Sequence, residues 1–325
     1  MPPSSMQWDL SLMPDISGKI AIVTGANANL GYETALGLAL GGAHVILACR
    51  SEERGRAAEA KLTSTLAETP EGKPRGSVEF MLLDVGDLKS IAAFVDAFLA
   101  KFDRLDLLVN NAGMKAINHS TTVDGFETQF GVNHLGHFAL TGRLFERLKQ
   151  NADRARIVNV SSISHHYVAL DFDNLNAAPP VYEAMDSYRK SKLATMLFSY
   201  ELDRRLKRAG IENVISVPCH PGVTESNLLP NLEKTYNWAI MRGIVRLIHK
   251  IPFAQSNAMG ALCILNAAVD PNVVGGEFIG PHGLAEFYGY PRVVPASKQS
   301  HDEAAAVRLW SESEKLTGVT FNVEK

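Results

Sequence analysis

Short apolar segments alternate with longer amphipathic ones along most of this chain. The apolar segments span residues 19–25, 44–50, 78–85, 105–113, 156–162, 212–222 and 276–281. Between them, apolar positions recur at helical spacing over residues 32–43, 52–68, 88–102, 123–149 and 186–209. Short strands that are apolar throughout and separated by helices are typical of a parallel sheet with both faces covered. The pattern predicts a doubly wound α/β fold with a seven-stranded parallel sheet.

No polar linker divides this pattern, and the chain contains no internal repeat or low-complexity tract. We therefore expect a single domain over residues 18–325, preceded by an N-terminal extension of residues 1–17. The last helical pattern, within residues 300–318, predicts a surface helix that turns Leu309 and Trp310 inward.

The composition narrows the function mainly by exclusion. Of the 325 residues, 46% are hydrophobic, and the formal net charge is −3, which leaves no electrostatic footprint for nucleic acid. Cys49, Cys219 and Cys263 are too scattered for a disulfide framework or a metal site, so we expect small buried thiols in a reducing compartment. We expect neither a signal peptide nor a membrane-spanning segment, and hence a cytoplasmic protein.

The first candidate site is the turn "TGANANLG" at residues 24–31, which follows a strand and opens a helix. Glycines there let the backbone approach a pyrophosphate, and the helix N-terminus supplies amide donors. Asn29 stands where such turns usually carry their middle glycine. Asn tolerates left-handed backbone angles, so the turn can form, but its side chain could crowd a cofactor. The alternative is a tight turn that binds no ligand.

Three further strand ends meet the same edge of the predicted sheet. The second strand ends at Arg50 and Ser51, where a basic residue suits a 2′-phosphate on the adenosine ribose. This favours NADP(H) over NAD(H), with a solvated surface charge as the alternative for Arg50. Asp84 and Val85 end the third strand, where an adenine would lie, and "NNAG" (110–113) ends the fourth.

A tyrosine and a lysine occupy the start of the long predicted helix over residues 186–209. Tyr188 and Lys192 are four residues apart and share a helix face. Carbonyl reduction needs a proton donor, and a nearby ammonium can lower the tyrosine pKa from its usual value of about 10. A serine of "VSS" (160–162) could hold a substrate oxygen, and Asn133 could hold a water for proton relay. Each of these residues also has a purely structural interpretation.

The segments "TGANANLG", "NNAG", "VNHLGHF", "NVSS" and "YRKSK" occur in an order that resembles the short-chain dehydrogenase/reductase family. "LACR", "SSISHH" and "DFDNLN" resemble its branch of retinol dehydrogenases and WW-domain oxidoreductases. The resemblance covers about residues 18–280 and implies a single-domain Rossmann fold. It implies Tyr188 as acid/base, Lys192 as its partner, Ser162 as substrate anchor and Asn133 as relay. It also implies a homodimer.

The same resemblance assigns the cofactor contacts and a substrate lid. The implied cofactor-binding residues are Gly25, Asn27, Asn29, Leu30, Gly31, Arg50, Ser51, Asp84, Val85, Asn111, Ala112, Gly113, Tyr188, Lys192, Pro221, Gly222, Val223 and Thr224. The lid would cover about residues 223–256, whose apolar character suggests a lipophilic carbonyl or alcohol. Arg242, Arg246, His249 and Lys250 also permit contact with a membrane surface.

These residues together predict an NADP(H)-dependent oxidoreductase that interconverts a lipophilic alcohol and its ketone or aldehyde. Two alternatives stay open. The first is a non-catalytic dinucleotide-binding regulatory protein, which Asn29 favours. The second is an epimerase or dehydratase with a tightly held cofactor. His165 and His166 have no ligand partners at metal spacing, and we interpret them as lining of the substrate pocket.

Overall fold

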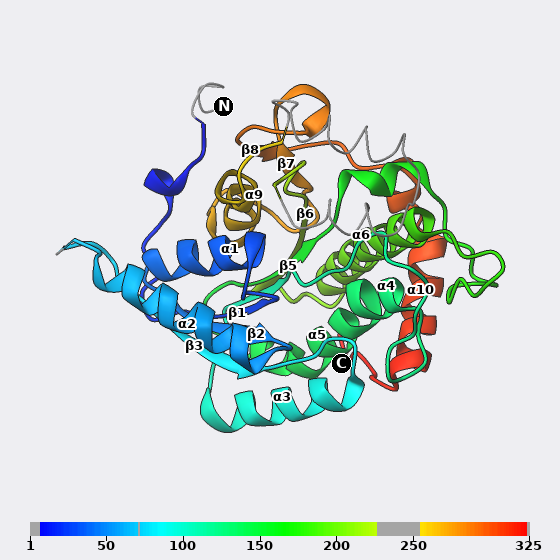
Figure 1. Ribbon diagram of the computed structural model, residues 1–325, viewed down its shortest axis with the longest axis horizontal. Helices are drawn as coiled ribbons and strands as arrows, with labels where there is room; N and C mark the ends of the chain where they lie inside the picture. The colour runs from blue at the N-terminus through cyan, green and yellow to red at the C-terminus, as the bar shows by residue number, and fades with distance from the viewer. Residues whose placement is uncertain (1–6, 71, 226–253, 324–325) are drawn as a thin grey trace.

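A central sheet organises the part of the chain that the computed structural model describes, residues 7–70, 72–225 and 254–323. There it has eight strands in the order β3-β2-β1-β4-β5-β6-β7-β8 (Figure 1). The strands are β1 (Ile20–Thr24), β2 (His44–Cys49), β3 (Ser77–Leu82), β4 (Leu107–Asn110), β5 (Ala155–Val160), β6 (Val214–Cys219), β7 (Ile279–Pro281) and β8 (Pro291–Val293). All neighbours pair in parallel except β7 and β8.

The predicted doubly wound α/β fold is confirmed, but the strand count of seven is wrong by one. The additional strand, β8, contains three residues and pairs antiparallel with β7. Such a short strand gives no detectable alternation in the sequence. The switch in strand order lies between β1 and β4, which are neighbours although β2 and β3 come between them in the chain.

Helices cover both faces of the sheet. They are α1 (Asn29–Leu40), α2 (Glu52–Ala67), α3 (Leu88–Lys101), α4 (Thr128–Phe130), α5 (Gly136–Lys149), α6 (Ala184–Arg208), α9 (Asn257–Val269) and α10 (Glu303–Thr317). In Figure 1, α1 and α9 lie above the sheet and α3 lies below it. One hydrophobic core joins the sheet to α1, α2 and α9, and another joins it to α3, α5, α6 and α10.

Two helices differ from the sequence prediction. The helix expected from residue 123 begins at Thr128, because Gly125 adopts a φ of 85° in a turn and Glu127 caps the first amides. It then continues through a π-helical turn, η2 (Gly131–Leu135), into α5. Helix α9 was not predicted at all. Its residues from Gly260 to Val269 are all buried, so it shows no polar face.

Residues near both ends of the described chain are also buried in the hydrophobic cores. Trp8 and Ile16, within the predicted N-terminal extension, are buried in the core that contains α1. Leu309 and Trp310 of α10 are buried, as expected. The predicted lid at about 223–256 lies almost entirely outside the described residues. None of the helices in the described ranges is both long and apolar enough to cross a bilayer.

Candidate active site

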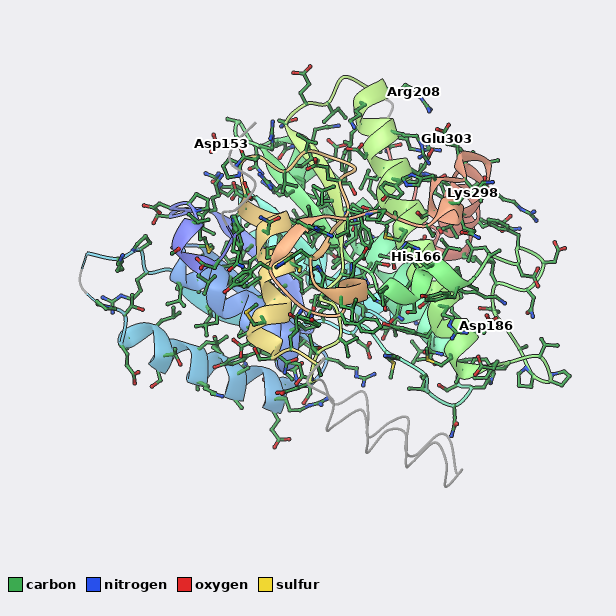
Figure 2. The ribbon with its side chains drawn as sticks, turned by 90° about the horizontal axis from the view of Figure 1, so that it is seen from above. Asp153, His166, Asp186, Arg208, Lys298 and Glu303 are labelled. Carbon is green, nitrogen blue, oxygen red and sulfur yellow. The ribbon has the colours of Figure 1, made fainter. Side chains whose placement is uncertain are left out.

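A cleft of about 500 Å³ opens at the carboxyl ends of the strands, beside the start of α6. Figure 2 labels Asp186 and Arg208 at opposite ends of α6, and the cleft residues Tyr188 and Lys192 belong to the Asp186 end. The cleft is lined by Gly25, Asn27, Ala28, Asn29, Leu30, Gly31, Ala48, Arg50, Ser51, Arg54, Leu83, Asp84, Val85, Asn111, Ala112, Gly113, Met114, Lys115, Val132, Val160, Ser161, Ser162, Ile163, Ser164, Tyr188, Lys192, Pro221, Gly222, Val223, Thr224 and Ala254. Every residue predicted to contact the cofactor is among them. Asn133 is not.

The turn after β1 forms a backbone cradle. Gly25 has a φ of 68° and Asn29 a φ of 50°, so Asn29 occupies the left-handed region that its side chain tolerates. A Cβ atom on Gly31 would lie 2.3 Å from the Gly25 carbonyl oxygen, so this position has no room for a side chain. The cradle is joined to β4 by Thr24, whose hydroxyl accepts hydrogen bonds from the amides of Asn111 and Ala112, both at 2.9 Å.

Helix α1 begins without a side-chain cap, unlike α2 and α6 beside the same cleft. Its N-cap residue is Ala28, and no side chain accepts a hydrogen bond from the first amides. By contrast, Ser51 caps α2 and Glu183 caps α6. Uncapped amides at a helix N-terminus are suited to an anion, because they are free donors at the positive end of the helix dipole. The cradle and the uncapped helix therefore fit the pyrophosphate of a dinucleotide.

Basic side chains gather where β2 ends. Arg50 follows the strand, and Arg54 lies in the first turn of α2; both are exposed at the rim of the cleft. The Arg50 guanidinium lies 3.9 Å from Asp84, an ion pair that is partly open to solvent. Arg54 was missed by the sequence analysis, although its place one helical turn after Arg50 is readable. The rim thus presents two guanidinium groups that can pair with an anion.

Tyr188 places its hydroxyl beside two serines. The hydroxyl groups of Ser162 and Ser164 both hydrogen-bond with it, and Ser164 also donates to Ser162 at 2.8 Å. Burial raises the pKa of Tyr188, and the two serine hydrogen bonds oppose that rise. The Ser161 hydroxyl donates instead to the Lys192 carbonyl at 2.9 Å. The role of Ser162 as substrate anchor stays a prediction. Ser164 was missed because a third serine carries no separate signal.

Lys192 is buried beneath Tyr188. Its ammonium donates to the Val160 carbonyl at 2.8 Å and lies 6.0 Å from the centre of the Tyr188 ring. Burial lowers the pKa of Lys192 to about 8. The expectation that Lys192 leaves the tyrosine with a lowered pKa is wrong for the structure as it stands. Desolvation of the enclosed hydroxyl raises its pKa more than the neighbouring serines lower it.

Asn133 lies behind the cleft, in the π-helical turn. Its side-chain carbonyl accepts from the Met114 amide at 2.8 Å, and its amide donates to the Met114 carbonyl at 2.9 Å and to Ser191 at 2.8 Å. Through these hydrogen bonds, the Asn133 side chain fixes the loop after β4. Its predicted relay role stays a prediction.

Neither histidine of "SSISHH" is among the described residues that line the cleft, and their interpretation as lining of the substrate pocket stays a prediction. His165 is fully buried, with Nδ1 2.7 Å from the Ser162 carbonyl oxygen and Nε2 accepting from the Ser297 amide at 3.1 Å. Burial lowers the pKa of His165 to about 4, so the ring is neutral and Nδ1 is the donor. His165 therefore holds the Ser162 backbone in place.

The sequence of this chain is similar to known proteins over most of its length. A family model described as short chain dehydrogenase matches residues 19–237. Human retinol dehydrogenase 13 is 38% identical over 308 residues, covering 94% of this chain and 86% of that protein. The WW domain-containing oxidoreductase of Gallus gallus is also 38% identical, over 309 residues that cover 93% of this chain and 69% of that protein.

Solved structures show the same fold. An uncharacterized protein from Mycobacterium paratuberculosis has a TM-score of 0.77 at 34% identity, covering 97% of this chain and 99% of that chain. The Pseudomonas aeruginosa RhlG/NADP active-site complex has a TM-score of 0.61 at 23% identity, covering 81% of this chain and 94% of that chain.

Proposed function

The chain belongs to the short-chain dehydrogenase/reductase family of oxidoreductases that act on CH–OH groups, and we propose that it interconverts a lipophilic alcohol and its ketone or aldehyde with NADP(H). The observation that carries the proposal is the convergence of two arrangements on one cleft. The cradle of β1 and the rim arginines line one part of it, and Tyr188 with Ser162 and Lys192 lines another.

The residues of the chain divide the work in a simple way. A bound nicotinamide would supply the hydride in reduction and accept it in oxidation. Ser162 holds the substrate oxygen, and Tyr188 donates a proton to it in reduction. Because burial keeps the pKa of Tyr188 raised, the hydroxyl is protonated at neutral pH and ready to donate. Lys192, which is charged below about pH 8, stabilises the tyrosinate that forms.

The choice of NADP(H) rests on Arg50 and Arg54. The choice of a lipophilic substrate rests on the apolar sequence of residues 230–255 and on the names of the retinol dehydrogenase relatives. The basic residues within 242–250 support a protein that contacts a membrane surface while working on such a substrate.

The test is NADPH consumption against a panel of lipophilic aldehydes and ketones, with NADH in parallel. We expect Tyr188→Phe to lose at least about a hundredfold in kcat, the range of general acid catalysis, with cofactor affinity unchanged. Tyr200→Phe is the matched control, because it removes a buried hydroxyl from the same helix outside the cleft lining. Turnover by Tyr188→Phe within a few fold of the wild type would sink the assignment. Cofactor binding without turnover by the wild type would favour the regulatory alternative.

A further inference from the structure

We propose that Lys115 recognises an anionic group on the substrate, so that the enzyme acts on lipophilic carbonyl compounds that also carry a negative charge such as a carboxylate. This inference rests on the proposed function and names its substrate class more closely. Lys115 follows the "NNAG" segment by two residues and lines the cleft, with its ammonium 5.5 Å from the centre of the Tyr188 ring.

The backbone on both sides of Lys115 is fixed by buried amide side chains. Asn133 binds both the amide and the carbonyl of Met114, at 2.8 and 2.9 Å. On the other side, the Ala116 amide donates to the Gln129 side chain at 2.7 Å, and Ala116 adopts a φ of 50°. Gln129 is itself fully buried. The position of Lys115 is therefore built into the fold, unlike that of a flexible surface lysine.

The Lys115 ammonium has no anionic partner among the residues that the structure describes. Among the described residues no hydrogen bond or ion pair engages it, and its recorded contact is with the face of the Tyr188 ring. Burial lowers the pKa of Lys115, which shows that its surroundings disfavour the charge. Lys115 is half-buried. A partly desolvated cation without a partner costs free energy, and an anionic ligand would offset that cost. A cleft for purely apolar molecules would be better lined at this point by an aliphatic side chain.

The geometry limits where the anionic group lies. A hydrogen bond of about 3 Å beyond an ammonium that lies 5.5 Å from the ring places the anion within about 9 Å of the ring centre. The reacting carbonyl must reach the hydroxyl of the same tyrosine. Both groups therefore lie within about 9 Å of the same ring centre. The rest of the molecule can still be apolar, which keeps it within the proposed function.

The experiment compares matched charged and neutral substrates. The probes are oxodecanoic acids that differ in the position of the ketone, each beside its methyl ester. We expect Lys115→Met to lower kcat/KM for the preferred acid by about tenfold to a hundredfold, the range for a hydrogen bond to a charged group. The methyl ester should change less than about threefold on the same argument, since it carries no charge. Lys115→Arg should retain most of the activity on the acid.

The control variant is Lys190→Met, which removes an ammonium from α6 that pairs with Asp186 and does not line the cleft. Equal losses on acid and ester, or no loss on either, would overturn the proposal. So would a tenfold loss of NADPH affinity in Lys115→Met, because Lys115 would then belong to the cofactor.

A binding measurement separates this inference from the proposed function. Decanoate, which has no carbonyl to reduce, is titrated calorimetrically into wild type and Lys115→Met, each saturated with NADPH. We expect decanoate to bind the wild type at least about tenfold more tightly, while methyl decanoate binds both alike. This result would support anion recognition even if the wild type reduced no ketone. Equal binding of decanoate to both proteins would contradict it even if ketone reduction were established.

Discussion

Cofactor preference can be tested at the rim of the cleft, where Arg50 and Arg54 lie around the end of β2. We expect the replacement of both by alanine to remove most of the preference for NADPH over NADH. The two single variants should each remove part of it. We choose these two side chains for the test of cofactor preference because they line the cleft next to Ser51, which caps α2.

The magnitude follows from their exposure. A hydrogen bond to a charged group contributes about 1.5–3 kcal/mol, but exposed ion pairs contribute only about 0–1 kcal/mol. The Arg50 side chain is 61% exposed and its guanidinium must leave Asp84, at 3.9 Å, to meet a phosphate. We therefore take about 1 kcal/mol for each arginine and about 2 kcal/mol for both, which corresponds to about a 30-fold change in the ratio of affinities.

The assay is the ratio of kcat/KM for NADPH to that for NADH, supported by fluorescence titration of each cofactor. Arg56→Ala is the matched control, because Arg56 lies on the same helix with a side chain 62% exposed but does not line the cleft. The preference should also shrink at high salt, since exposed charges are screened. A ratio that changes less than twofold in the double variant, with affinity for NADH unchanged, would refute the reasoning.

Two further predictions concern the backbone cradle and the buried lysine. Gly31→Ala should weaken cofactor binding at least about tenfold and lower the free energy of unfolding by about 1–3 kcal/mol, because the new Cβ would lie 2.3 Å from the Gly25 carbonyl oxygen. Fluorescence titration measures the affinity and urea unfolding measures the stability. An unchanged affinity would contradict the close approach. Burial lowers the pKa of Lys192 to about 8, so its ammonium is charged below that pH and neutral above it. We therefore expect kcat/KM for reduction to fall as the pH rises through about 8. A flat profile up to about pH 10, where an ordinary lysine titrates, would contradict the role of the Lys192 charge.

The sequence predicted the cleft well because parallel strands all end at one edge. Once each apolar segment was assigned, the residues after it had to converge, and the lining of the cleft shows Gly25, Arg50, Asp84 and Gly113 together. The prediction was weakest where the usual patterns are absent. Helix α9 has no polar face, and β8 is too short to alternate.

The directions of individual side chains were the other feature that the sequence could not predict. No rule of spacing shows that Ser164 joins Ser162 at the Tyr188 hydroxyl, or that His165 turns away from the cleft to hold Ser162. The raised pKa of Tyr188 could not be predicted from the sequence either. Sequence proximity places Lys192 one turn away, but only the burial of the hydroxyl decides which effect is larger.

The aromatic part of the core beneath α5 and α6 has a consequence for how the protein is made. Phe138 of α5 and Phe198 of α6 pack against Trp310 and Phe321, with ring centres 4.9–6.3 Å apart among these four residues. During synthesis, Phe321 emerges long after the helices it must meet, and such distant contacts form slowly. A nascent chain therefore exposes the aromatic side chains of α5 and α6 until its last residues emerge. It can bind chaperones there before it can catalyse anything.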